Sequence, residues 1–196
     1  MLKPVRITAP LVEPVSLEEA RDRLRIDHHE EDPLIASLIA ATTAHLDGWS
    51  GTLGRALVNQ TWAQQFPRFP SGEVLGLALA PAQSIVSIVY YDAANVQQTL
   101  DPSVYTLLDD ELGPFVTRQV DQAWPATFSR EDAVTVTYVA GYGPAGDDVP
   151  AAIRHAMLLL IGHWYEHRES VVVGGNPVQV PLAVQALLRP YRRVRL

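Results

Sequence analysis

Residues 134–169 have the sequence VTVTYVA GYGPAGDDV PAAIRHAMLLLIGHWYEHRE, which changes periodicity once. Up to Tyr138, valine and tyrosine alternate with threonine, and this period of two is typical of a strand with one buried face. From Pro150 to Glu169, apolar residues recur every three or four positions, as in an amphipathic helix. The expected inward-facing residues of this helix are Ile153, Met157, Leu160, Ile161 and Trp164. We therefore expect a strand, a glycine-rich loop and the most apolar helix of the chain, which should lie at the centre of the core.

The sequence before this stretch predicts further strands between residues 57 and 140. Short segments rich in Val, Ile, Tyr or Leu are bounded there by Pro, Gly or Asp, as strands commonly are. These segments are 74–80, 84–91, 103–108 and 114–118, with an alternating pattern around Trp62 before them. The connections are too short to hold crossover helices, so we expect about six mostly antiparallel strands.

Residues 16–50 predict two helices. Ser16 and Glu19 have the spacing of a capping box, in which each side chain accepts a hydrogen bond from the other residue's backbone N–H. Asp32 and Pro33 then provide a start for a second helix, because proline is well tolerated at the first helical position. Apolar residues on one face of that helix end before Gly48.

These elements predict an α+β fold, with the N-terminal helices and a long C-terminal helix packed together and a small, mostly antiparallel β insert. We expect one domain over residues 1–180, made of the helices in 16–50, the β insert 57–140 and the helix 150–169. Residues 170–180 predict a mobile loop. Residues 181–196 should form a separate C-terminal docking helix and tail, since Pro190 ends any helix there.

Composition excludes several classes of protein. The 196 residues include no cysteine, which excludes disulfides, thiolate metal sites and a cysteine nucleophile. The apolar runs are much shorter than the eighteen or so residues that cross a bilayer, so we expect no membrane association. The formal net charge is −7, but four arginines lie in the last eight positions, which hold no acidic residue. The rest of the chain carries 11 basic and 22 acidic residues and should bind nucleic acid poorly.

The sequence contains no recognisable catalytic, cofactor or metal site. His163 and His167 have a spacing that can chelate a metal, but no third ligand is near them in sequence, so two surface histidines are the better interpretation. His28 and His29 lie in a charged segment that a solvated turn explains. The loop Gly141–Gly143 follows a strand and precedes a helix, but Asp147 and Asp148 would repel phosphate. We predict that the protein is not an enzyme and uses no cofactor or metal.

Ordered motifs over about residues 10–192 nevertheless form a pattern. They are Ser16–Ala20 with Leu24–Asp27, Glu31-Asp32 with the helix Leu34–Leu46, Trp62, Trp124-Pro125, Val134–Tyr138, Ala140–Gly143, Val149–Ile153, His163–Glu169, Val180–Val184 and Leu187–Tyr191. Together they resemble the head–tail connector, or adaptor, family of long-tailed bacteriophages and phage-derived gene transfer agents. Each motif alone is weak, and the likeness lies in their order.

The resemblance implies a structural adaptor that forms a ring, usually twelvefold, under the capsid portal. It implies the portal protein on one side, and stopper, head-completion or tail proteins on the other. DNA would pass through the lumen without specific binding. The protein would be located in the virion or phage-like particle, and in the bacterial host cytoplasm during assembly.

The C-terminal segment is the predicted portal-binding element, because apolar residues and arginines are interspersed in it. The predicted portal-binding residues are Leu187, Leu188, Arg189, Tyr191, Arg192, Arg193, Val194, Arg195 and Leu196. A solvated basic end that aids solubility is an alternative interpretation. For the whole chain, the alternatives are an enzyme of unrecognised type and a nucleic-acid-binding module.

Overall fold

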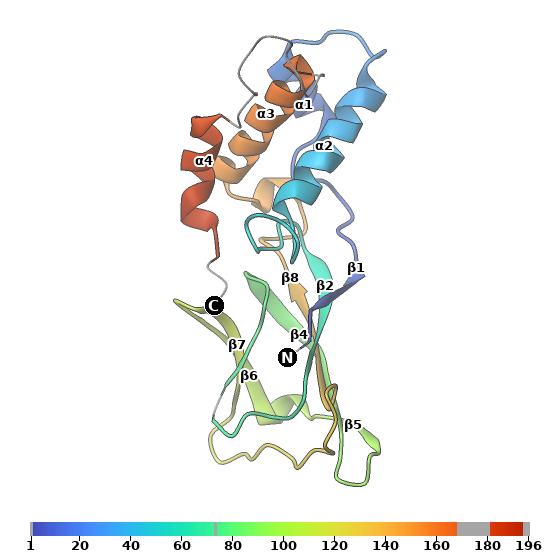
Figure 1. Cartoon of the computed structure of the whole chain (residues 1–196), viewed down its shortest axis with the longest axis vertical. Coiled ribbons are helices and arrows are strands. Elements are labelled where there is room, and N and C mark those ends of the chain that lie inside the picture. Colours follow the sequence, from blue (N-terminus) through green and yellow to red (C-terminus); the bar gives the residue numbers. More distant parts are fainter. Residues whose placement is uncertain (1, 73, 168–180, 194–196) are drawn as a thin grey trace, which may run out of the picture. The chain divides into compact units, whose positions relative to one another are not determined.

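A computed structural model describes residues 2–72, 74–167 and 181–193 (Figure 1). Contacts between Cα atoms divide the chain into two compact units, each built from two separate segments. The β unit comprises Met1–Pro10 and Asn59–Tyr142, and the helical unit comprises Leu11–Val58 and Gly143–Leu196.

The helical unit contains the α-helices of the described residues. They are α1 (Leu17–Leu24), α2 (Asp32–Leu46), α3 (Ala151–Glu166) and α4 (Leu182–Leu188), with the 3-10 turns η2 (Gly146–Asp148) and η3 (Arg189–Tyr191). Helices α1, α2 and α3 pack on one another, and α4 packs on α3. Ala20, Ile35, Ile39 and Ile161 form a buried cluster between the first three helices. The apolar face of α3 is therefore central to this unit.

Local sequence signals position these helices. The Ser16–Glu19 capping box is confirmed, because Glu19 N donates to Ser16 Oγ at 3.1 Å and Ser16 N donates to Glu19 Oε2 at 2.9 Å. Helix α2 begins at Asp32 with proline in its first turn. After α2 the chain folds tightly, and a Cβ on Gly51 would lie 2.3 Å from Leu46 O, so no larger residue fits there without a shift of the backbone.

The β unit contains two sheets whose neighbouring strands are all antiparallel. A five-stranded sheet has the order β1-β2-β8-β4-β5, and a three-stranded sheet has the order β3-β7-β6. The strands are β1 (Val5–Thr8), β2 (Gln60–Phe66), β3 (Val74–Gly76), β4 (Ala82–Tyr91), β5 (Gln97–Thr99), β6 (Tyr105–Asp110), β7 (Gly113–Arg118) and β8 (Val134–Ala140); the 3-10 turn η1 (Pro102–Val104) precedes β6. The strand predicted at Val134–Tyr138 is confirmed as the centre of the larger sheet.

Buried polar side chains join the two sheets. Gln64 is fully buried; its Oε1 accepts from Ala78 N at 2.8 Å and its Nε2 donates to Gly76 O at 3.2 Å. The Tyr138 hydroxyl accepts from Leu79 N at 3.3 Å. These bonds hold the segment after β3 against the inner face of the five-stranded sheet, because each buried donor or acceptor is costly to leave unpaired.

The predicted fold class is wrong in two respects. Helix α3 has 16 residues and ends at Glu166, so the predicted long C-terminal helix is not formed. Its end coincides with the polar residues Glu166 and His167, which offer no apolar side chain for burial. The β part is not a small insert, since the described residues form eight strands in two sheets and only four short α-helices. The fold is mixed α+β and rich in β structure.

Candidate docking surface in the C-terminal segment

Helix α4 is held in the helical unit by one face and exposes the other. Val184 and Leu188 lie four residues apart, on one side of the helix, and are 1% and 2% exposed. Leu182 is 81% exposed, and Leu187 is half-buried. The helix therefore attaches to its own unit through Val184 and Leu188 and leaves other side chains exposed.

The chain after α4 is also attached to the helical unit. Arg55 Nε donates to Tyr191 O at 2.6 Å, and Arg193 N donates to Leu53 O at 3.0 Å. Both anchoring residues come from the segment between α2 and β2, which is mostly buried. Specific hydrogen bonds therefore attach Tyr191 and Arg193 to the rest of the helical unit.

The structure distributes the predicted portal-binding residues over different environments. Leu188 is buried, so it is not accessible to a partner, whereas Arg189 and Arg192 are exposed. Leu187, Tyr191 and Arg193 are half-buried. Val194, Arg195 and Leu196 lie outside the described residues, as does the loop predicted at 170–180. We name the exposed and half-buried side chains of residues 182–193 the docking surface.

Sequence reasoning missed the residues that anchor this surface. Asp47 Oδ1 accepts from Leu57 N at 2.7 Å and closes the segment from which Leu53 and Arg55 reach the C-terminal residues. The Arg55–Tyr191 contact joins positions 136 residues apart. The hydrophobic periodicity of a short stretch of sequence cannot indicate a contact between residues so far apart. The glycines from Gly48 onward did indicate a tight turn.

The two histidine pairs singled out in the sequence contact neighbouring groups at a helix end and in a turn. His163 and His167 have ring centroids 4.7 Å apart, and His167 Nδ1 lies 2.9 Å from His163 O, at the end of α3. His29 Nδ1 lies 2.9 Å from both Arg21 Nη1 and Asp32 Oδ2, on an exposed turn. Residues 2–72, 74–167 and 181–193 contain no group of three or more metal-ligating side chains of the His, Cys, Asp or Glu type.

The glycine loop before α3 is filled by a carboxylate. Ala145 N donates to Asp148 Oδ2 at 2.8 Å, and a Cβ on Gly143 would lie 2.3 Å from that same oxygen. The carboxylate thus occupies the place a phosphate would need. In the part of the chain that the structure describes, no helix is long and apolar enough to cross a membrane.

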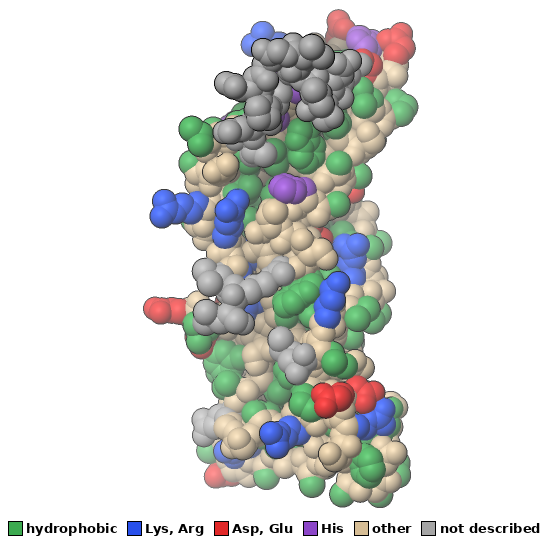
Figure 2. Space-filling model, viewed as in Figure 1, with side chains coloured by type: hydrophobic (Ala, Val, Ile, Leu, Met, Phe, Trp, Pro, Cys, Tyr) green, Lys and Arg blue, Asp and Glu red, His purple; other side chains and the backbone are tan. Residues whose placement is uncertain are grey.

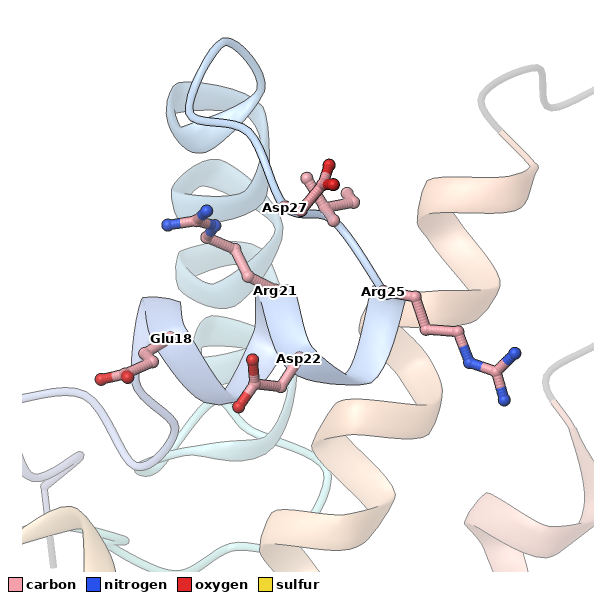
Figure 3. Close-up of a pocket in the computed structure, with 6 residues that line it drawn as sticks. Glu18, Arg21, Asp22, Arg25 and Asp27 are labelled. Atoms are coloured by element: carbon pink, nitrogen blue, oxygen red, sulfur yellow. The ribbon is translucent and has the colours of Figure 1, made fainter.

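A shallow charged hollow lies at the end of α1 (Figure 3). It is lined by Glu18, Arg21, Asp22, Arg25, Ile26 and Asp27. Figure 3 shows Arg25 and Arg21 pointing in opposite directions, with the carboxylates of Glu18, Asp22 and Asp27 also diverging. Catalysis needs side chains that converge on one reacting atom, and this arrangement does not provide that.

One carboxylate in the helical unit has a shifted pKa because it is a helix cap. Burial raises the pKa of Glu19, but hydrogen bonds from the backbone and hydroxyl of Ser16 and the charge of Arg154 outweigh it and lower the pKa below 4.5. Arg154 pairs with Glu19 and with Asp147, the latter at 2.6 Å. A carboxylate shifted in this direction is held ionised, which suits a structural role.

Exposed loops of the β unit contain further carboxylates with a lowered pKa, two of which are Asp92 and Asp132. Hydrogen bonding from the Val96 backbone, followed by that from Gln98, lowers the pKa of Asp92 in the β4–β5 turn. A hydrogen bond from Arg130 lowers the pKa of Asp132, and the two side chains pair at 2.6 Å. Both shifts result from turn-stabilising contacts.

Charge is mixed over the visible surface in Figure 2, where basic, acidic and hydrophobic side chains alternate without a broad basic patch. Exposed acids gather at the turn between β6 and β7, where Asp109, Asp110 and Glu111 adjoin Leu112, which is 75% exposed. A duplex-binding module would place a continuous basic face on its folded elements. The visible surface does not have that character.

Comparison with solved structures identifies proteins of the same fold. A chain from "Neck of empty GTA particle computed with C6 symmetry" is 23% identical, with a TM-score of 0.78, covering 100% of this chain and 97% of that chain. A chain from "Virion of native gene transfer agent (GTA) particle" is 22% identical with a TM-score of 0.78 and the same coverage. A third, from "Neck of native GTA particle computed with C12 symmetry", is 21% identical with a TM-score of 0.72 and again the same coverage. A search of curated proteins found no match.

The fold is thus shared with chains of particle necks. The family model described as "Head completion protein" matches residues 13–194, which is nearly the whole sequence. The chain belongs to the head completion protein family. Membership of this family gives the chain a structural role in completion of the head.

Proposed function

We propose that the protein forms a ring under the capsid portal and links the portal to stopper or tail components, without catalysing a reaction. The observation that carries this proposal is the match to the head completion family over residues 13–194. The symmetry stated for two neck structures of the same fold supports a ring, and twelve copies is the number we propose. Assembly would take place in the bacterial host cytoplasm, before the particle is complete.

The docking surface is the part we assign to the portal. Arg189 and Arg192 are exposed and form no ion pair with any residue that the structure describes. The backbone bonds of Tyr191 and Arg193 hold these arginines in place before binding, which lowers the entropy lost on docking. Carboxylates on the portal would be suitable partners, because charge-assisted hydrogen bonds contribute about 1.5–3 kcal/mol each.

The net charge of −7 fits a lumen through which DNA passes. Retention of DNA requires a surplus of basic side chains that neutralise phosphates, and each such contact strengthens binding. An acidic chain in many copies would repel the duplex and let it move. We therefore propose that DNA passes through the ring without specific binding.

A charge-reversal experiment tests the docking surface. The double variant Arg189→Glu, Arg192→Glu should still fold and form rings but bind its own portal at least tenfold more weakly. The control is Arg23→Glu, Arg68→Glu, which changes the charge equally at two other exposed arginines. Equal portal affinity of the two double variants would place the portal contact elsewhere.

A further inference from the structure

Each sheet of the β unit has one buried face and one outer face. Phe66, Ile88 and Val136 lie on the buried face of the five-stranded sheet, and Leu75 and Val116 lie on that of the three-stranded sheet. Hydrogen bonds from Gln64 and Tyr138 join the segment after β3 to the inner face of the larger sheet. The remaining faces are therefore on opposite sides of the unit.

The central rows of the outer face of the five-stranded sheet consist of uncharged, mostly small side chains, whereas at one end Tyr91 and Gln97 follow, with the Arg130 guanidinium 3.7 Å from the centre of the Tyr91 ring. Strand register places its residues in rows: Val5, Ala63, Thr137 and Ser87 in one; Gln65, Thr135, Val89 and Thr99 in the next; Thr61, Val139 and Ser84 in the third. We name this set the Thr-rich face. Val5 is 58% exposed, and the central Thr135 and Thr137 are half-buried.

The outer face of the three-stranded sheet is apolar. Register places Val74, Thr117 and Thr106 in one row, and Phe115 and Leu108 in the next. We name this set the apolar face. Val74 is 50% exposed and Leu108 is 47% exposed. Among described residues, the charged side chain of this face is Asp110, which lies at the turn and accepts from the backbone of Leu112 and Gly113.

The absence of charge from the central rows of both faces indicates protein contact. The sequence has 37 charged residues, 15 basic and 22 acidic, yet the central rows of both faces contain none among those described. Cores of protein interfaces are depleted of charge in this way, whereas a free surface mixes charged residues throughout. Exposed β-branched and aromatic residues on a sheet also favour association if they remain uncovered.

We propose that the Thr-rich face of one copy packs against the apolar face of the next copy. Two different patches on opposite sides of one unit define a head-to-tail interface, which closes into a ring when the rotation between copies is suitable. This inference rests on the ring of the proposed function and names the surfaces that build it. The small side chains of one face would accommodate Phe115, Leu108 and Val74 of the other.

Complementary charges test this pairing. Thr137→Lys puts a charge at the centre of the Thr-rich face, and Leu108→Glu puts the opposite charge on the apolar face. Each variant alone should raise the concentration at which half of the chains are in rings at least tenfold. An equimolar mixture should restore rings, because alternating copies would pair lysine with glutamate at one contact and keep the native faces at the next.

Controls separate folding from assembly. Ala93→Lys, in the β4–β5 turn, and Ser103→Glu, in the 3-10 turn η1, introduce the same charges at exposed residues that belong to neither face, and they should leave ring formation unchanged. Far-UV circular dichroism and thermal unfolding of all four variants should match the wild type. Native mass spectrometry and negative-stain electron microscopy, alone and with the portal, measure the rings.

The outcomes are distinguishable. Rings that persist in Thr137→Lys or Leu108→Glu would overturn the inference, as would a mixture that fails to restore them. Intact rings of Thr137→Lys that no longer bind a tail component would assign the Thr-rich face to that component instead. A wild-type chain that forms no ring, even with the portal, would refute the proposed function itself.

Discussion

Two leucines of helix α4 allow the folding role of the C-terminal segment to be separated from its docking role. Leu188 is 2% exposed and Leu182 is 81% exposed, although both belong to the same short helix. Changing either to alanine removes the same atoms. Leu188→Ala should lower the free energy of unfolding by about 2–4 kcal/mol, because it removes buried surface and leaves a cavity. Leu182→Ala should change it by less than about 0.5 kcal/mol, as other exposed substitutions do.

Thermal and urea unfolding measure this difference. For a chain of this length 1 kcal/mol corresponds to roughly 2–4 °C in Tm, so Leu188→Ala should lower Tm by about 5–15 °C. Leu188→Ala should bind the portal with near-wild-type affinity at temperatures where it is folded, whereas Leu182→Ala, which removes an exposed side chain of the docking surface, should bind it more weakly. If Leu188→Ala left stability unchanged but abolished portal binding, Leu188 would be a docking residue and our assignment of α4 would be wrong.

Three further predictions concern other parts of the chain. Glu19→Gln should lower stability by about 0.5–1.5 kcal/mol at pH 7. The pKa of Glu19 is lower in the folded protein than in the unfolded chain, so its contribution to the free energy of unfolding is fully present above about pH 4.5 and is lost as the pH falls through the pKa of the folded state. The difference in urea unfolding between variant and wild type should therefore shrink in acid. A constant difference would contradict the capping role. Gln64→Leu should cost about 1–3 kcal/mol, because it removes the buried amide that accepts from Ala78 N and donates to Gly76 O, whereas Gln65→Leu on the next residue should cost less than about 0.5 kcal/mol; similar urea midpoints for the two would refute the buried hydrogen bonds. In a mobility-shift assay at about 0.15 M salt, the wild-type chain should retain no duplex DNA at micromolar concentration, and a sequence-independent shift there would contradict a non-binding lumen.

Local signals predicted the elements whose cause is local. The capping box at Ser16 depends on residues three apart, and the strand at Val134–Tyr138 depends on alternation within five residues, so both can be inferred from sequence. The strands β1 and β5 were missed, because β1 has four exposed residues and β5 is the polar sequence QQT. Neither contains the buried alternation on which strand prediction relies.

The separation of the β unit into two sheets also has a non-local cause. Strand β3 pairs with β7, about forty residues later, and β1 pairs with β2 across the whole N-terminal helical segment. A hydrophobic pattern shows which face of a strand is buried but not which strand it pairs with. The docking residues show the same limit: the pattern in the tail suggested that Leu188 and Arg189 act together, whereas packing buries one and exposes the other.

The most direct test of the central claim is an electron cryo-microscopy reconstruction of the protein bound to its own portal. We predict a closed ring of copies in which residues 182–193 of each copy contact the portal and Arg189 and Arg192 face portal carboxylates. A complex in which this segment faces away from the portal, or in which single copies bind without forming a ring, would contradict the proposed role.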